Sequence, residues 1–250
     1  MLLKDKIALV TGSTHNIGLG IARACAREGA KVIIISRHEE DAKNVAAELG
    51  GDYFAADVGE PGQVNALFDH IRKRHRRLDI LVNCVAHAAT GGVLDVPLEE
   101  WNRVIAVNLP GYFLTIQYAA RIMKDQGQGA IVNISAASGE RASPGGAAYS
   151  VSKGAINSLT RQAAVDLAPY KIRVNGVIAG IVGTPMGQDS MGNRKSEYDI
   201  IPLRRIGQPE DVAEAVVFLV SDKASYITNA ILPVDGGRMN AMPSASASRG

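Results

Sequence analysis

The chain has 250 residues, of which 46% are hydrophobic and 21% charged, and its formal net charge is +2 at pH 7. This length is enough for one large α/β domain with its own core. So small a net charge creates no global field that would attract a nucleic acid or a membrane surface, and we expect neither as a partner.

Cysteine and histidine usage argues against two further classes of site. The two cysteines, Cys25 and Cys84, lie far apart, which excludes a disulfide framework and a cysteine-type metal site. The five histidines lack the regular spacing of ligand pairs, so we expect no bound metal. The sequence shows neither a signal-peptide pattern nor an apolar run of membrane-spanning length. A reducing cytoplasm is therefore the expected location.

The first predicted element is a buried strand over 6–10, which leads into a glycine-rich turn and an amphipathic helix over 17–28. Strand, glycine turn and helix in this order are the context of a phosphate-binding turn. A helix N-terminus offers free N–H groups and the positive end of its dipole to a pyrophosphate. A tight turn that binds nothing is the alternative. The residues expected to contact a cofactor here are Gly12, Thr14, Asn16, Ile17 and Gly18.

The second predicted strand, over 32–35, ends at Ser36 and Arg37. In a dinucleotide-binding fold an acidic side chain at this point would hold the ribose 2′-hydroxyl of NAD, whereas an arginine suits the 2′-phosphate of NADP. Position 36 is not acidic and Arg37 is available, so we expect NADP. His15 in the glycine turn is either a second donor to that phosphate or a solvated loop side chain.

The rest of the chain continues the alternation of strands and helices. Pro110 interrupts one helical pattern because it cannot donate to the carbonyl of Ala106, so we expect a kink or break there. The basic run 72–77 is interpreted as a solvated helix end that complements the dipole, with a patch for nucleic acid or an acidic carrier protein as the alternative. Further strands are predicted over 52–56, 80–82, 130–134, 172–178 and 227–234, and helices over 61–77, 101–123, 209–220 and a stretch ending near 168.

Two segments are expected to lack regular structure. The polar, glycine-containing stretch 183–205 has the composition of a mobile flap over a site, and the small polar tail 241–250 is expected to be disordered. No linker divides the rest of the chain. The pattern therefore predicts one domain over 1–240, a doubly wound parallel sheet of the Rossmann-like α/β class with helices on both faces.

Tyr149 and Lys153 stand four residues apart in the helical pattern that ends near 168, so their side chains lie on one helix face. A buried lysine beside a tyrosine favours the phenolate and lowers the phenol pKa from its free value of about 10. A tyrosine tuned in this way can donate or accept a proton near neutral pH. The same pattern also occurs on surface helices without any chemistry, so it gains weight only from the other features.

Taken in order, these features resemble the short-chain dehydrogenase/reductase family over nearly the whole chain. No single motif decides this, but the ordered set is specific. The resemblance implies a dinucleotide-binding fold and hydride transfer between a nicotinamide and a carbonyl or alcohol carbon. The set comprises the glycine turn at 11–18, Asp57, Asn83 with Ala86, Asn108, Tyr149 with Lys153, and the segments 179–185, 208–211 and 233–237.

The resemblance also implies roles for individual residues. Tyr149 would be the acid/base, Lys153 would hold the nicotinamide ribose and lower the tyrosine pKa, and Asn108 would anchor a water in the proton relay. A homo-oligomer is implied too, most simply a homotetramer. Further cofactor contacts would come from Asp57, Val58, Asn83, Ala86, Gly180, Val182 and Thr184, and a small-molecule substrate would be bordered by His87, Ala137, Ser138, Pro144, Gly145, Ile181 and Met186.

The chain departs from the family pattern at two important positions. The middle glycine of the turn is Asn16, and asparagine is the non-glycine residue best able to adopt a positive φ. The position of the family's catalytic serine is held by Ala136. Ser135 and Ser138 flank it, but in extended backbone their side chains should point elsewhere.

Ala136 leaves three interpretations open. The chain is an NADP(H)-dependent ketone reductase or alcohol dehydrogenase with impaired activity, a catalytically silent cofactor-binding protein or partner subunit, or an engineered serine-to-alanine variant. The intact Asn108, Tyr149 and Lys153 favour an enzyme over drift to a pure binding role. The substrate stays open among sugars, steroids, acyl thioesters and small cyclic ketones, and the direction of reaction stays open too.

Overall fold

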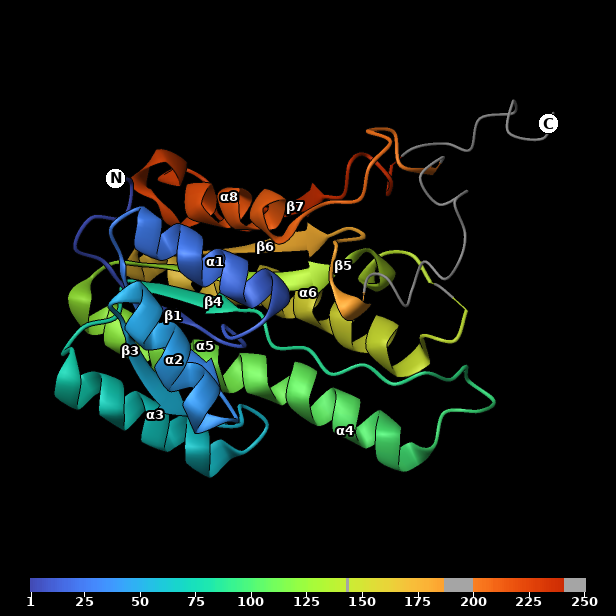
Figure 1. Ribbon diagram of the computed structural model, residues 1–250, viewed down its shortest axis with the longest axis horizontal. Coiled ribbons are helices and arrows are strands. Elements are labelled where there is room, and N and C mark those ends of the chain that lie inside the picture. The colour runs from blue at the N-terminus through green and yellow to red at the C-terminus, as the bar shows by residue number, and fades with distance from the viewer. Residues whose placement is uncertain (143, 187–199, 241–250) are drawn as a thin grey trace.

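The computed structural model describes residues 1–142, 144–186 and 200–240. Its centre is a seven-stranded parallel sheet in the order β3-β2-β1-β4-β5-β6-β7 (Figure 1). This confirms the predicted doubly wound, Rossmann-like α/β class. The strands are β1 (Ile7–Val10), β2 (Lys31–Ser36), β3 (Asp52–Ala55), β4 (Ile80–Asn83), β5 (Gly129–Ala136), β6 (Ile172–Ala179) and β7 (Ile231–Val234).

Helices cover both faces of the sheet. One face carries α1 (Asn16–Arg27), α2 (Glu39–Leu49) and α8 (Pro209–Val220), and the other carries α3 (Pro61–Arg74), α4 (Leu98–Asn108), α5 (Pro110–Gln126) and α6 (Ala147–Leu167) (Figure 1). Short 3₁₀ turns lie at η1 (Ala137–Gly139), η2 (Ala168–Tyr170) and η4 (Asp222–Ala224). Within the described ranges, none of the helices combines the length and the apolar character needed to cross a bilayer.

Successive side chains of a strand point to opposite faces of the sheet. Because helices cover both faces, the side chains on both sides of the strands are buried. In β1, Ala8 and Val10 pack with α1 and α8, whereas Leu9 between them packs with the helices of the other face. In β2, Ile33 and Ile34 divide in the same way. Two separate hydrophobic cores therefore hold one rigid sheet between them.

The sheet brings the loops that follow its strands to one edge. β1 lies between β2 and β4, so the chain leaves β1 in one direction and returns to build β4 on its other side. In open parallel sheets a crevice forms outside the carboxyl ends of the strands at such a reversal, and ligands bind there. The glycine turn after β1 lies at this point.

The break at Pro110 is confirmed. Helix α4 ends at Asn108 and α5 begins at Pro110, with Leu109 between them at φ −108° and ψ −60°. Proline tolerates the first position of a helix because its missing N–H would have no partner there. The break leaves Asn108 at a helix end, where its side chain can face neighbouring elements.

Several predicted boundaries were wrong. The helical stretch predicted over 101–123 begins at Leu98 and ends at Gln126. The last strand begins at Ile231 rather than at 227, because Asn229 takes a left-handed φ of 65° and donates its N–H to the carbonyl of Val174 at 2.8 Å. Helix α3 ends at Arg74 rather than at 77, because Arg76 also has a positive φ, 59°. Of the expected flap, residues 187–199 lie outside the described residues, and so does the tail 241–250.

Candidate active site

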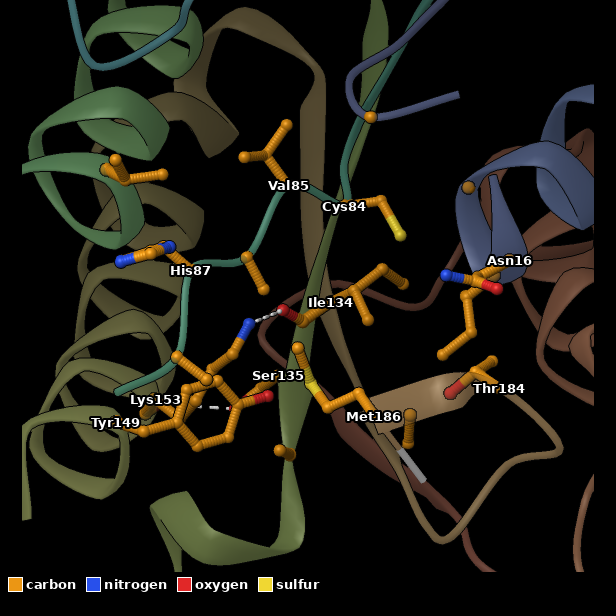
Figure 2. A pocket seen from close by; sticks show the side chains of 18 of the residues that line it. Asn16, Cys84, Val85, His87, Ile134, Ser135, Tyr149, Lys153, Thr184 and Met186 are labelled. Carbon is orange, nitrogen blue, oxygen red and sulfur yellow. Dashed lines mark hydrogen bonds between the residues drawn. The ribbon is translucent and has the colours of Figure 1, made fainter. Parts of the chain in front are cut away.

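A cavity of about 1470 Å³ opens at the carboxyl ends of the strands, lined by the loops that follow β1 to β6 (Figure 2). Most residues expected from the sequence lie in its wall. Asn83, Asn108 and Gly145 do not, and Gly146 lies in the wall in place of Gly145. The expected residues in the wall are Gly12, Thr14, His15, Asn16, Ile17, Gly18, Ser36, Arg37, Asp57, Val58, Ala86, His87, Ala136, Ala137, Ser138, Pro144, Tyr149, Lys153, Gly180, Ile181, Val182, Thr184 and Met186.

The glycine turn is closed too tightly for side chains at two positions. Gly12 has φ +66°, and a Cβ at Gly18 would lie 2.1 Å from the carbonyl oxygen of Gly12. Asn16, the first residue of α1, has φ 51°, which confirms that asparagine replaces the middle glycine by adopting the left-handed region. The first turn of α1 carries no acidic residue, so nothing there opposes an anion. The turn therefore fits a pyrophosphate at the start of α1.

The loops after β2 and β3 form the next part of the wall. Asp57 is held by its own loop, since its Oδ1 accepts from the N–H of Gly59 at 2.8 Å. Arg37 is exposed, and the described part of the chain records no ion pair for it. His15 is close to Thr14, with 2.9 Å between Nδ1 and Oγ1. Arg37 and His15 therefore leave positive charge and a ring donor at the end where the adenine ribose would lie.

Lys153 is the buried cation of the site, with a relative exposure of 2%. Its Nζ donates to the carbonyl of Ile134 at 3.0 Å, and it lies 5.5 Å from the ring centroid of Tyr149 and 5.6 Å from that of Tyr112 (Figure 2). Burial lowers the pKa of Lys153 to about 8. The side chain therefore keeps its charge at neutral pH, held by one carbonyl and two aromatic faces.

The pKa of Tyr149 moves opposite to the sequence expectation. Burial raises it to about 12, because a phenolate in the cavity wall would lose its hydration, and Lys153 does not offset this cost. Lys153 gives its hydrogen bond to Ile134 instead of the tyrosine oxygen. Tyr149 is thus a neutral phenol in this structure, a group that can donate a proton to oxygen.

Asn108 lies behind the wall and is fully buried. Its Nδ2 donates to the carbonyl of His87 at 2.8 Å and to the hydroxyl of Ser152 at 3.0 Å, and its Oδ1 accepts from the N–H of His87 at 2.8 Å. It therefore ties the loop after β4 to helix α6, one residue before Lys153. The water that Asn108 is expected to anchor stays a prediction.

Ala136 ends β5 and lies in the cavity wall, so no hydroxyl is present at the expected serine position. Ser135 also lines the wall, but its buried hydroxyl donates to the carbonyl of Lys153 at 3.2 Å, so its side chain points away from the expected serine position and toward α6. Ser138 lies in the wall as expected, but on η1 rather than in extended backbone. Its Oγ is buried without a hydrogen-bond partner in the described part of the chain.

Sequence reasoning missed part of the wall. Cys84 is in it, and burial raises the pKa of its thiol to about 12, so it is a small residue without a reactive thiolate. Arg238 and Met239 directly follow the 233–237 segment, and no motif marks these two residues as part of the wall. Other missed wall residues include His38, Gly59, Glu60, Arg103, Val107 and Ala142.

Asn83 lies outside the wall, in a buried hydrogen-bond network beneath the cavity. Its Oδ1 accepts from Thr115 at 2.8 Å and its Nδ2 donates to Asn133 at 3.0 Å, and Asn133 in turn donates to Thr160 at 3.0 Å. This buried ladder joins α5, β4, β5 and α6. It fixes the strands on which the loops of the cavity rest.

Comparisons with known proteins agree with this geometry. A family model described as Enoyl-(Acyl carrier protein) reductase matches residues 12–239. The 2-(S)-hydroxypropyl-CoM dehydrogenase 3 of Xanthobacter autotrophicus is 40% identical over 250 residues, covering 94% of this chain and 97% of that protein. The NADP-dependent (R)-specific alcohol dehydrogenase of Lentilactobacillus kefiri is 36% identical, covering 94% of this chain and 97% of its own length.

A solved structure has the same fold. The gluconate 5-dehydrogenase from Burkholderia cenocepacia, determined in complex with NADP and tartrate, superposes with a TM-score of 0.93 at 33% identity. The match covers 96% of this chain and 97% of that one. The relatives named here are dehydrogenases that act on alcohols or hydroxy compounds.

Lys153→Met should raise the free energy of unfolding at pH 7 and reduce turnover. The drop in pKa from 10.5 to about 8 reflects the cost of burying the charge. That cost is about 3 kcal/mol, and methionine would remove it. The Ile134 carbonyl keeps the Tyr112 hydroxyl as a donor at 3.1 Å, so no buried acceptor is left unpaired. Thermal unfolding and a turnover assay measure the two effects, and we expect turnover to fall by roughly 10²-fold or more.

The pH dependence provides the control for this prediction. The folded protein releases the Lys153 proton at a lower pH than the unfolded chain does, so the penalty should shrink as the pH rises from about 8 to 10.5. The stability gap between the variant and the wild type should narrow over the same window. A variant no more stable than the wild type at pH 7 would contradict the assignment of Lys153 as a costly buried cation.

Proposed function

This chain belongs to the short-chain dehydrogenase/reductase family, a family of oxidoreductases, and we propose that it is an NADP(H)-dependent enzyme that interconverts a ketone and a secondary alcohol. The interconversion of alcohols and carbonyl compounds is the activity that its relatives share. One observation carries the proposal: Tyr149 and Lys153 meet in the wall of the cavity that the glycine turn also lines.

The residues of the chain divide the chemical work. A bound nicotinamide cofactor supplies the hydride for reduction and accepts it in oxidation. The turn from Gly12 to Gly18 binds the pyrophosphate, and Arg37 binds the 2′-phosphate. Tyr149 donates its proton to the carbonyl oxygen, and in the reverse direction it takes a proton from the alcohol. The phenolate that forms in the donating step carries a negative charge, which the ammonium of Lys153 offsets only in part, since burial keeps the pKa of Tyr149 at about 12.

The lost serine hydroxyl supports a second candidate function, a silent cofactor-binding subunit. Ala136 cannot donate a hydrogen bond to a substrate oxygen, so turnover is the property most at risk. A turnover assay with NADPH and a panel of aliphatic, cyclic and acidic ketones separates the two. Oxidation of NADPH that depends on a ketone supports the enzyme, and its absence with every ketone, despite tight NADPH binding, supports the binding protein.

The proposal extends to the location and the assembly of the protein. We place the protein in the cytoplasm, in keeping with its two free cysteines. We also propose a homotetramer, because apolar side chains are exposed on the helices where assembly is expected, Phe113 on α5, Val151 and Val165 on α6 and Phe218 on α8. Light scattering at micromolar concentration should give a mass near four times 26.4 kDa, and a monomer mass would refute the assembly.

Arg37→Ala should weaken NADPH binding far more than NADH binding. A charge-assisted bond between arginine and phosphate contributes roughly 1.5–3 kcal/mol, which corresponds to about 10- to 100-fold in affinity. Isothermal titration calorimetry with both cofactors measures the difference. Tighter binding of NADH than of NADPH by the unmodified protein would overturn the cofactor assignment.

Ala136→Ser should raise kcat by about 10²–10³-fold, the typical effect of one preorganised donor to a developing oxyanion. The substitution adds one hydroxyl at the end of β5, in the cavity wall. NADPH affinity should change little, because the hydroxyl acts on the substrate oxygen. Steady-state kinetics and NADPH titration of the same preparation measure both quantities.

Ser138→Ala is the matched control for that substitution. Ala136→Ser adds a hydroxyl at the end of β5, and Ser138→Ala removes one from η1, two residues further along the chain. One combination of results would contradict the assignment: the present chain is already fast, Ala136→Ser leaves kcat unchanged, and Ser138→Ala lowers kcat. In that case Ser138 is the donor, and the alignment of Ala136 with the serine position is wrong.

A further inference from the structure

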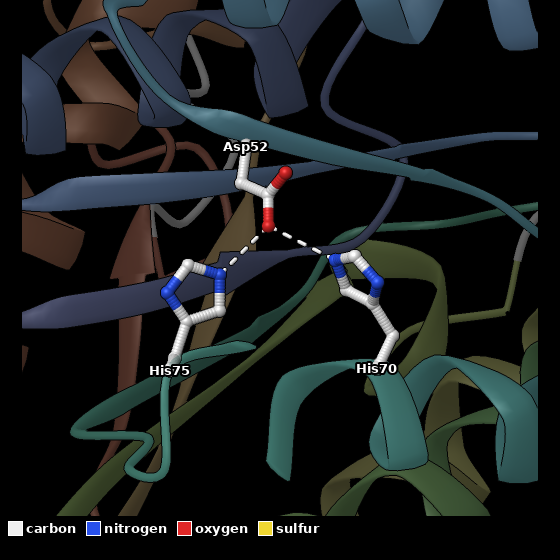
Figure 3. Close-up of side chains that lie close together, drawn as sticks. All are labelled: Asp52, His70 and His75. Carbon is white, nitrogen blue, oxygen red and sulfur yellow. Dashed lines mark hydrogen bonds and ion pairs between the residues drawn. The ribbon is translucent and has the colours of Figure 1, made fainter. Parts of the chain in front are cut away.

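The side chains of Asp52, His70 and His75 form a cluster (Figure 3). Asp52 is the first residue of β3, at the end of that strand opposite the one that leads into the active-site loops. His70 lies on the last turns of α3, and His75 follows the end of this helix directly. None of the three lies in the wall of the active-site cavity. The cluster therefore has no part in the proposed reaction.

The three side chains converge on one atom. The Oδ2 of Asp52 lies 2.9 Å from Nε2 of His70 and 2.7 Å from Nε2 of His75. One ligand atom from each residue lies within 4.8 Å of the other two. Both imidazoles thus present a ring nitrogen to the same small volume beside a carboxylate oxygen.

We propose that Asp52, His70 and His75 bind a divalent transition metal ion, with Zn²⁺ as the natural occupant. Two imidazole nitrogens and one carboxylate oxygen are ligands that suit zinc and its neighbours, whereas Mg²⁺ and Ca²⁺ prefer sets made of oxygen alone. With three protein ligands, water completes the tetrahedron. Ligands on a tetrahedral zinc stand roughly 3.3 Å apart, so each imidazole would move outward by roughly half an ångström as the ion replaces the shared protons.

Two cations oppose metal binding. Arg74 places its Nε 2.8 Å from the same Oδ2, and Lys31 adds positive charge near His75. The Arg74 side chain is 59% exposed, so it can turn into the solvent at little cost. The His70 side chain is 26% exposed and leaves a path for the ion, whereas those of Asp52 and His75 are only 6% and 3% exposed. Arg74 thus competes with the metal for one oxygen, and its removal should favour the metal.

A metal at this position would join the end of α3 to the start of β3. β3 is an edge strand, paired on one side with β2. An ion that binds only the folded chain stabilises it by mass action. At a hundredfold excess of free metal over Kd, the melting temperature should rise by roughly 5–10 °C.

The test uses the full chain without an affinity tag, dialysed first against EDTA and then against buffer. Zn²⁺ titrated into it by calorimetry should bind at one equivalent, and Co²⁺ should give the visible absorption of a tetrahedral ion. His70→Ala should weaken Zn²⁺ at least about 10- to 100-fold, since loss of even an outer partner of a metal site has that effect. His70 is the most exposed of the three, so this variant is the one most expected to fold, which circular dichroism checks.

Arg74→Gln should change the Zn²⁺ affinity in the opposite direction to His70→Ala. It removes the competing cation and should tighten Zn²⁺ binding, which a purely structural hydrogen-bond cluster would not do. His38→Ala, a substitution of an exposed histidine outside the cluster, is the matched control and should leave Zn²⁺ affinity unchanged. The proposal is overturned if neither the wild type nor Arg74→Gln binds one equivalent. It is equally overturned if His70→Ala binds as tightly as the wild type.

Discussion

The buried ammonium of Lys153 is the charge around which the site is arranged. Burying it is costly, so the surroundings must supply a carbonyl from β5 and the faces of two tyrosine rings to keep it charged. These partners lie on three elements, β5, α5 and α6. The position of the Lys153 side chain therefore depends on how α5 and α6 pack against β5. The same burial raises the pKa of Tyr149 to about 12, so its side chain stays a neutral phenol at pH 7.

Buried polar groups behind the cavity keep those elements in register. Asn108 joins the loop after β4 to α6, and the ladder through Asn83 and Asn133 joins α5 to α6 across two strands. A buried polar group costs free energy unless it is paired, so such networks favour one arrangement over its neighbours. The residues that a family resemblance would place on the cofactor thus include some that act by holding the strands beneath it.

Charged side chains gather at both ends of the strands, but they suit different partners. At the carboxyl edge, the start of α1 and the exposed Arg37 favour a bound anion. At the other edge, Asp52 gathers two histidines and an arginine around one oxygen. The parallel sheet keeps these regions apart, because all strands run in one direction and place their two ends on opposite sides.

The sequence by itself determined the fold class, most strand and helix positions, the break at Pro110 and most of the cavity wall, because these follow from local periodicity, from turn chemistry and from residues that directly follow strands. The positive φ of Asn16 was predictable for the same local reason. Only the tertiary structure decided the direction of the Tyr149 pKa, which depends on burial and on the hydrogen bond of Lys153 to Ile134. It also decided that Arg238 reaches the cavity and that Asp52 meets His70 and His75, since residues far apart in the chain become neighbours only when the sheet and its helices pack.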